Sequence, residues 1–73
     1  MTAAGGRAAM VLLASGDVFV GDCHVADGLI CLANVRLKYG SGADAWYREV
    51  DDRSWPTRSP RVVEVRYPSR ETP

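Results

Sequence analysis

The sequence lacks the features that mark several large classes of protein. Two cysteines in 73 residues are too few for the disulfide framework of a small secreted domain. No apolar run approaches the length of about 18 residues that a transmembrane helix needs, so no membrane span is expected. The start of the chain lacks the basic segment and the cleavage site of a secretory signal. We therefore predict a cytoplasmic protein with reduced thiols.

The chain also lacks an excess of charge of either sign. Nine Lys and Arg residues balance nine Asp and Glu residues, so the formal net charge is +0. This balance argues against a generic polyanion binder held by bulk electrostatics, although a local basic patch is compatible with it. The hydrophobic fraction of 47% is too high for a disordered chain. Length and composition thus predict one small domain of marginal stability.

What the sequence does contain is a series of short strand signals. No window shows a convincing helical period, and Gly or Pro interrupts most windows. Apolar and alternating runs predict strands at residues 8–14, 18–25, 29–39, 45–50 and 61–67. The polar, proline-containing segment 51–60 is predicted to be a loop. The pattern predicts an all-β fold, a small five-stranded antiparallel barrel of the SH3-like or Sm-like kind.

We expect this barrel to form a single domain over residues 8–68. A flexible N-terminus is predicted over residues 1–7, and a frayed C-terminal tail over residues 69–73. Asp27 and Gly28 lie between two apolar runs and predict a tight hairpin turn. Gly21 lies inside a strand and predicts a bend or bulge that curls the sheet.

The two cysteines flank the predicted hairpin. A three-residue turn over 26–28 would place Cys23 opposite Cys31 on the core face. The thiols can then be free and pack as small hydrophobic groups, or form a disulfide. A metal site with His24 is a third interpretation, but His24 is predicted to point to the other face and a fourth ligand is missing. We favour free thiols and predict neither a metal nor a cofactor.

Catalytic signatures are weak. His24 is the only histidine, and Asp22 lies two residues away, but the sequence places no nucleophile beside them. Asp51 and Asp52 are adjacent, which is typical of a solvated loop and not of an acid–base pair. No phosphate loop, dinucleotide fingerprint or zinc knuckle is present. The chain is therefore predicted not to be an enzyme.

Residues 11–35 resemble the first signature of the Sm and Sm-like proteins. Gly16, Phe19, Gly21 and Asp27 stand at the spacing of that signature, and an apolar strand follows. The resemblance implies a small β-barrel.

The resemblance does not extend to the RNA-binding residues of that family. Leu29 stands in the place of the base-contacting Asn, because Gly28 follows Asp27 directly and the turn is shorter. The second signature is echoed only by Val65 and Arg66, without the glycine that should follow. The fold is implied, and the RNA pocket is not.

Aromatic and Arg residues form the richest signal for binding. They are Trp46, Tyr47, Arg48, Arg53, Trp55, Arg58 and Arg61. Trp, Tyr and Arg are the usual hot spots of protein interfaces, which predicts a protein partner whose identity stays open. The same groups stack on bases and bind phosphate, so a nucleic acid or a nucleotide is the alternative. In a third interpretation Trp46 caps the barrel core, Trp55 fixes the Pro-rich loop and the Arg side chains are only solvated.

An apolar face opposite the predicted core indicates self-association. The predicted homo-oligomer interface consists of Val18, Val20, Ile30 and Leu32, together with Met10 or Leu12. A small domain needs only one apolar face for its core, and burial of the second against another subunit would add stability. We therefore predict a self-associating, non-enzymatic interaction module.

Overall fold

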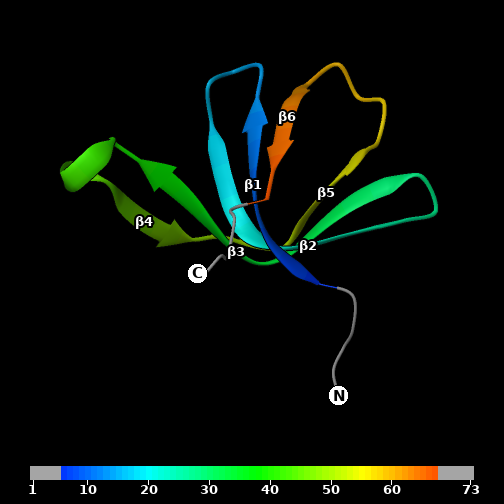
Figure 1. Ribbon diagram of the computed structural model, residues 1–73, viewed down its shortest axis with the longest axis horizontal. Helices are drawn as coiled ribbons and strands as arrows, with labels where there is room; N and C mark the ends of the chain where they lie inside the picture. Colours follow the sequence, from blue (N-terminus) through cyan, green and yellow to red (C-terminus); the bar gives the residue numbers. More distant parts are fainter. Residues whose placement is uncertain (1–5, 68–73) are drawn as a thin grey trace, which may run out of the picture.

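The computed structural model describes residues 6–67 and contains six β-strands and one short 3-10 turn (Figure 1). The elements are β1 (Arg7–Leu13), β2 (Val18–Ala26), β3 (Leu29–Tyr39), η1 (Gly42–Asp44), β4 (Trp46–Glu49), β5 (Arg53–Pro56) and β6 (Val62–Arg66). The predicted all-β class is confirmed. Within the described residues no helix is long and apolar enough to cross a membrane.

The predictions for the two chain ends are tested only in part. The tail over 69–73 lies outside the described residues, as does most of the N-terminal segment 1–7. The exception is at residues 6 and 7, where Arg7 already belongs to β1 and pairs with Cys23 of β2.

One antiparallel sheet contains all six strands. Its order is β4-β3-β2-β1-β6, and β5 pairs with the other half of β3. Arg36 opposes Glu49 in β4, and Leu32 opposes Arg53 in β5, so both short strands keep one register against β3. β4 and β5 are therefore two parts of one strand that is interrupted at residues 50–52. Figure 1 shows β4 at the left of the sheet and β5 at the right. This separation explains why six strands form where the sequence predicts five.

The sheet is open. β6 pairs with β1, and no ladder joins β6 to β4 or β5 within residues 6–67. The Ser59 N–H donates to the Pro56 carbonyl at 2.9 Å in a turn between β5 and β6. The Thr57 N–H donates to the Gly28 carbonyl at 2.9 Å, next to the end of the β3–β5 pairing, so neither donor joins β5 to β6. The structure thus has an open, bent sheet in place of the closed five-stranded barrel that the sequence predicts.

A bulge at Gly21 decides which side chains reach the core. Val20 opposes Arg36, whereas Asp22 opposes Ala33, so β3 holds one extra residue at this point. The sequence-based prediction of a bulge at Gly21 is confirmed. Because the alternation of faces inverts across the bulge, Leu32 and Val35 are both buried although they are three positions apart.

The inverted alternation corrects two predicted placements. Ile30 and Leu32, predicted for the outer oligomer interface, are buried in the core with exposed fractions of 6% and 1%. Cys31, predicted for the core face, lies on the other side, as does Leu29, which is 37% exposed. The alternation of β3 is regular on each side of the bulge but cannot be extended through it.

The hairpin turn is confirmed at Asp27 and Gly28, but its length differs from the prediction. Both residues have positive φ, 54° and 75°, and Ala26 opposes Leu29. The turn therefore contains two residues and not three, which is the geometry favoured by Asp-Gly. The shorter turn moves the pairing by one residue, so Cys31 opposes His24 in place of Cys23.

The core includes a residue from the segment predicted to be a loop. Its buried members are Ala9, Val11, Phe19, Cys23, Ile30, Leu32, Val35 and Trp55. Trp55 lies in β5 opposite Ile30, and its ring centroid is 5.6 Å from that of Phe19. Pro56 ends the strand, where a missing N–H is tolerated. Residues 53–56 therefore form a strand although their sequence is polar, because the strand buries the Trp55 side chain.

Candidate interaction surface

The side chains of β4 and β5 are assigned to faces by their partners on β3. Leu32 and Leu37 belong to the core or pack against it, so Arg53 and Arg48, which oppose them, point to the same inner face. Trp46 follows two residues before Arg48 and opposes Tyr39. The exposed rim of the inner face therefore carries Tyr39, Trp46, Arg48 and Arg53, which we call the Arg–Trp surface.

Trp46 is the most prominent group of the Arg–Trp surface. Its ring lies parallel to that of Tyr39, with a centroid distance of 4.1 Å and an interplanar angle of 7°. Even so, Trp46 is 55% exposed. The stack holds the indole in one orientation while part of it stays open to a ligand. Binding to such a pre-oriented aromatic ring costs little side-chain entropy.

Arg53 lies at the opposite end of the surface, against the core. Its guanidinium carbon is 5.2 Å from the centroid of the Phe19 ring, which itself packs on Trp55. Arg48 lies in β4, between Trp46 and Arg53 along the chain, and its side chain is exposed. Both guanidinium groups are thus accessible on the inner face.

The carboxylates borne by the strands lie on only one face of the sheet. Every carboxylate borne by a strand within residues 6–67 points to the outer face, from Asp22, Glu49 or Glu64. The only salt bridge in this part of the chain joins Arg66 to Glu64 at 3.1 Å. The guanidinium groups of Arg48 and Arg53 therefore pair with no carboxylate of the described residues and are available to an anionic group.

The structure divides the seven predicted binding residues among several places. Trp46, Arg48 and Arg53 share the Arg–Trp surface. Tyr47 points to the outer face, where the Arg36 guanidinium carbon lies 5.8 Å from its ring centroid. The other three are Trp55, which is buried, and Arg58 and Arg61, which are exposed in the turns between β5 and β6.

Trp55 is the clear correction within this set. Only 9% of its surface is exposed, so its indole cannot serve as a contact for a partner. It packs in the core, whereas the third interpretation gave the core position to Trp46 and placed Trp55 against the Pro-rich loop. The sequence shows two similar Trp residues in polar surroundings, and only their pairing partners on β3 separate the buried one from the exposed one.

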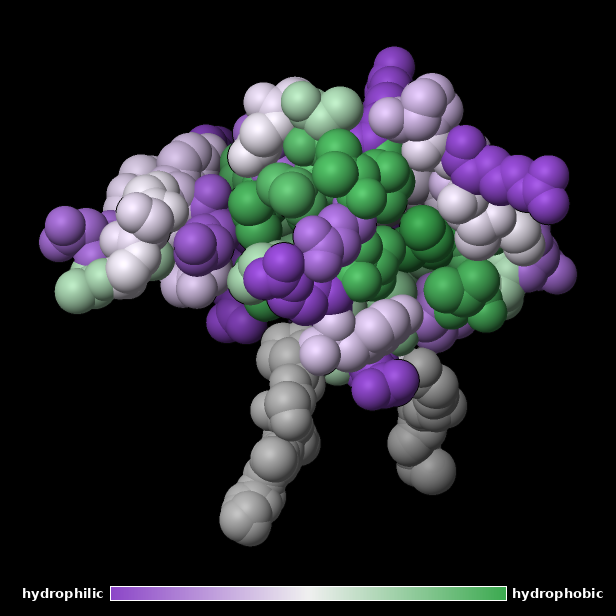
Figure 2. All heavy atoms as spheres, turned by 45° about the horizontal axis from the view of Figure 1, so that its top comes forward, coloured by the Kyte–Doolittle hydropathy of each residue, from purple (hydrophilic) through white to green (hydrophobic). Residues whose placement is uncertain are grey.

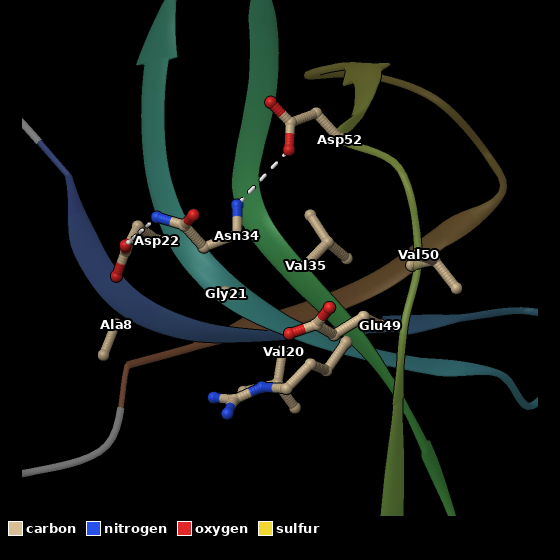
Figure 3. A pocket seen from close by; sticks show the side chains of 10 residues that line it. Ala8, Val20, Gly21, Asp22, Asn34, Val35, Glu49, Val50 and Asp52 are labelled. Carbon is tan, nitrogen blue, oxygen red and sulfur yellow. Dashed lines mark hydrogen bonds between the residues drawn. The ribbon is translucent and has the colours of Figure 1, made fainter.

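A hollow of about 430 Å³ lies on the outer side of the bulge (Figure 3). Asn34 crosses it: its side-chain amide donates to Asp22 Oδ2 at 3.0 Å, and its backbone N–H donates to Asp52 Oδ1 at 3.3 Å. Asn34 has a φ of 54°, which interrupts the pairing of β3 with β2 at this residue. The Asn34 N–H is therefore bonded by the Asp52 side chain and not by a strand carbonyl. The two carboxylates thus support the bulge. Within residues 6–67 no group of three potential ligands is placed to hold a metal ion.

The outer face also carries an apolar patch, formed by Met10, Leu12, Val18 and Val20, which are all partly buried. Leu12 opposes Val18, and Met10 opposes Val20, so the four side chains form two adjacent cross-strand pairs. A shallow hollow of about 140 Å³ lies over this patch. Figure 2 shows hydrophobic side chains gathered on one face, with hydrophilic ones crossing between them.

Both cysteines are free, and they lie on opposite faces of the hairpin. Cys23 is buried, and its Sγ is 3.7 Å from the Tyr67 hydroxyl oxygen. This hydrogen bond and partial burial raise the pKa of Tyr67. Cys31 opposes the exposed His24, but no hydrogen bond joins the thiol to the imidazole among the described residues. The placement excludes both a Cys23–Cys31 disulfide and a metal site shared by the two thiols.

Comparisons with protein-family models, with curated proteins and with solved structures returned no match for this chain. The function is therefore inferred from the residues themselves. The most specific arrangement among them is the Arg–Trp surface, where one stacked, exposed indole lies near unpaired guanidinium groups.

Proposed function

We propose that this chain is a non-enzymatic interaction module that binds a protein partner through the Arg–Trp surface. The observation that carries the proposal is the exposed ring of Trp46, held against Tyr39 at 4.1 Å. Trp and Arg dominate the hot spots of protein interfaces, where a few anchors supply most of the binding energy. Arg48 and Arg53 add hydrogen-bond donors that no carboxylate of residues 6–67 engages.

The fold type belongs to the same proposal. We propose a variant of the SH3-like or Sm-like barrel in which β4 and β5 together take the place of one strand. The shared register of β4 and β5 and the return of β6 to the edge of β1 support this assignment.

Replacement of Trp46 by serine is expected to abolish capture of the partner. Removal of one hot-spot anchor costs about 2 kcal/mol or more, which is roughly a 30-fold loss of affinity. The measurement is affinity capture from a lysate of the source cell, with the wild-type chain, Trp46→Ser and Tyr47→Ser each used as bait. The captured protein is then purified and titrated against each of them. Tyr47→Ser is the matched control, because Tyr47 is the neighbouring aromatic residue and points to the outer face. Equal loss with both variants, or no protein that depends on Trp46, would contradict the proposal.

A nucleic acid or a nucleotide is the alternative ligand of the same surface. The accessible indole of Trp46 near Arg48 favours it, since bases stack on aromatic rings and guanidinium groups bind phosphates. Binding of this kind to the Arg–Trp surface would weaken steeply with added salt and would fall with Arg48→Ala or Arg53→Ala.

We also propose that the chain self-associates through the outer apolar patch. Leu12 and Val18 lie in one cross-strand row, which Lys38 extends on one side and Glu64 on the other. A two-fold axis parallel to the strands would place Lys38 of one copy against Glu64 of the second, with the apolar pair between them. Opposite charges at the two ends of one row make the patch self-complementary.

Reversal of either charge is expected to weaken the dimer about tenfold, because two symmetric pairs become repulsive. Combining Lys38→Glu with Glu64→Lys should restore the wild-type dissociation constant. Sedimentation velocity over a concentration series measures it, and Val20→Asp should abolish association by placing a charge in the apolar patch. A wild-type chain that stays monomeric at all concentrations, or a double variant no better than the single ones, would refute this interface.

A further inference from the structure

We propose that the partner presents an extended peptide segment with two separated carboxylates, which lies along β4 and β5 of this chain. The carboxylates contact Arg48 and Arg53, and an apolar side chain contacts Trp46. This inference rests on the proposed function, because it names the chemistry that the Arg–Trp surface selects.

Charge complementarity is the first argument. Arg48 and Arg53 are exposed on the inner face and pair with no carboxylate of residues 6–67. The strands place Asp22, Glu49 and Glu64 on the outer face instead. A ligand on the inner rim therefore meets guanidinium groups, which bind carboxylates through paired hydrogen bonds.

The open edge of β4 is the second argument. β4 pairs only with β3 within the described residues, so its other edge is free. The Val50 N–H donates to the Val35 carbonyl at 3.0 Å, and the antiparallel alternation that follows from this bond directs the backbone groups of Tyr47 and Glu49 away from β3. An extended segment bonded to those groups would place alternate side chains beside Trp46 and Arg48.

The sequence between the two arginines sets the spacing of the carboxylates. Asp51 and Asp52 lie in the segment between β4 and β5, between Arg48 and Arg53 along the chain, and both are exposed. A chain with a negative charge at every position would be repelled at its centre, which disfavours a continuous phosphate backbone. Arg48 and Arg53 are five residues apart, so their Cα atoms lie at most about 16 Å from each other. A peptide with two acidic residues four to six positions apart can reach both arginines. Uncharged residues between the two acidic ones avoid repulsion by the acidic segment between β4 and β5.

Synthetic peptides test this spacing directly. The probe is a fluorescein-labelled nonapeptide, Leu-Thr-Glu-Val-Thr-Val-Glu-Thr-Thr, titrated into the full chain and followed by fluorescence polarisation. A second peptide of the same composition carries the two Glu residues side by side at its centre, a third carries Gln in place of Glu, and a thymidine nonanucleotide represents nucleic acid. We expect the first peptide to bind at least tenfold more tightly than the other three probes.

Variants of the chain locate the contact. Arg48→Gln and Arg53→Gln should each weaken binding of the first peptide about tenfold, because each removes a charge-assisted contact. Arg36→Gln is the matched control: it makes the same charge change on the outer face and should leave binding unchanged. Circular dichroism confirms that each variant is folded.

Three results would overturn the inference. Equal binding of the peptide with adjacent Glu residues would remove the spacing argument, and tighter, salt-sensitive binding of the oligonucleotide would make nucleic acid the ligand. If no peptide binds while capture of a protein still depends on Trp46, the inference is wrong and the proposed function stands. If capture also fails, both are wrong.

Discussion

Replacement of Trp55 by alanine is expected to cost about 3–5 kcal/mol of unfolding free energy. The Trp55 side chain is 9% exposed and packs on Phe19, opposite Ile30 of β3. Its removal would leave a cavity that a thin, open sheet has few other side chains to fill. A domain of this size has a total stability on the order of 5–10 kcal/mol. The variant should therefore lose between about a third and all of the stability of the wild type.

Trp46→Ala provides the matched comparison, because it makes the same chemical change at an exposed position. Trp46 is 55% exposed and contacts Tyr39 by stacking, so its loss should cost about 1 kcal/mol. Urea denaturation followed by far-ultraviolet circular dichroism measures both variants against the wild type. Equal destabilisation by the two substitutions would mean that Trp55 does not occupy the core as described.

A methyl group at position 21 is expected to destabilise the fold by about 3 kcal/mol. The Cβ of Gly21→Ala would lie 2.6 Å from the Ala33 carbonyl oxygen, 3.2 Å from Leu32 Cγ and 3.3 Å from the Asn34 carbonyl oxygen. The closest neighbour is backbone, which cannot move without altering the pairing of β2 with β3 at the bulge. The clash therefore disturbs the bulge, which decides which side chains of β3 point to the core.

The control for this substitution is Gly6→Ala, just before β1. Its added Cβ would lie 3.3 Å from Asp22 Cβ, a contact that a small shift relieves, so the change in unfolding free energy should stay below about 1 kcal/mol. Urea denaturation again gives the comparison. A Gly21→Ala variant as stable as the wild type would show that the bulge is not tightly packed around this position.

Much of the fold follows from local sequence patterns. The range 29–39 predicted for the third strand agrees with β3, and the ends of the other predicted strands lie within a residue or two of β1, β2, β4 and β6. Alternating apolar residues and tight turns determine these elements, because both depend only on neighbours in the chain. Asp27 and Gly28 predict their turn for the same reason, since both take positive φ with little strain.

The candidate site was predicted less well, because its residues depend on pairing between distant segments. Trp46 and Trp55 have similar neighbours in the sequence, yet one stacks on the partly buried Tyr39 and the other opposes the buried Ile30. Asn34 carries no sequence signal beyond its tolerance of positive φ. Its hydrogen bonds to two carboxylates arise only when three separate segments meet at the bulge.

By itself, then, the sequence determined the β class, the positions of the strands matched above and the hairpin turn, all of which follow from steric preferences along the chain. The tertiary structure decided the register. A two-residue turn and one bulge moved Cys31 away from Cys23 and turned Ile30 and Leu32 into the core. The physical reason is the period of two in a β-strand: a shift of one residue in pairing exchanges the two faces, and that shift is settled by packing across the sheet.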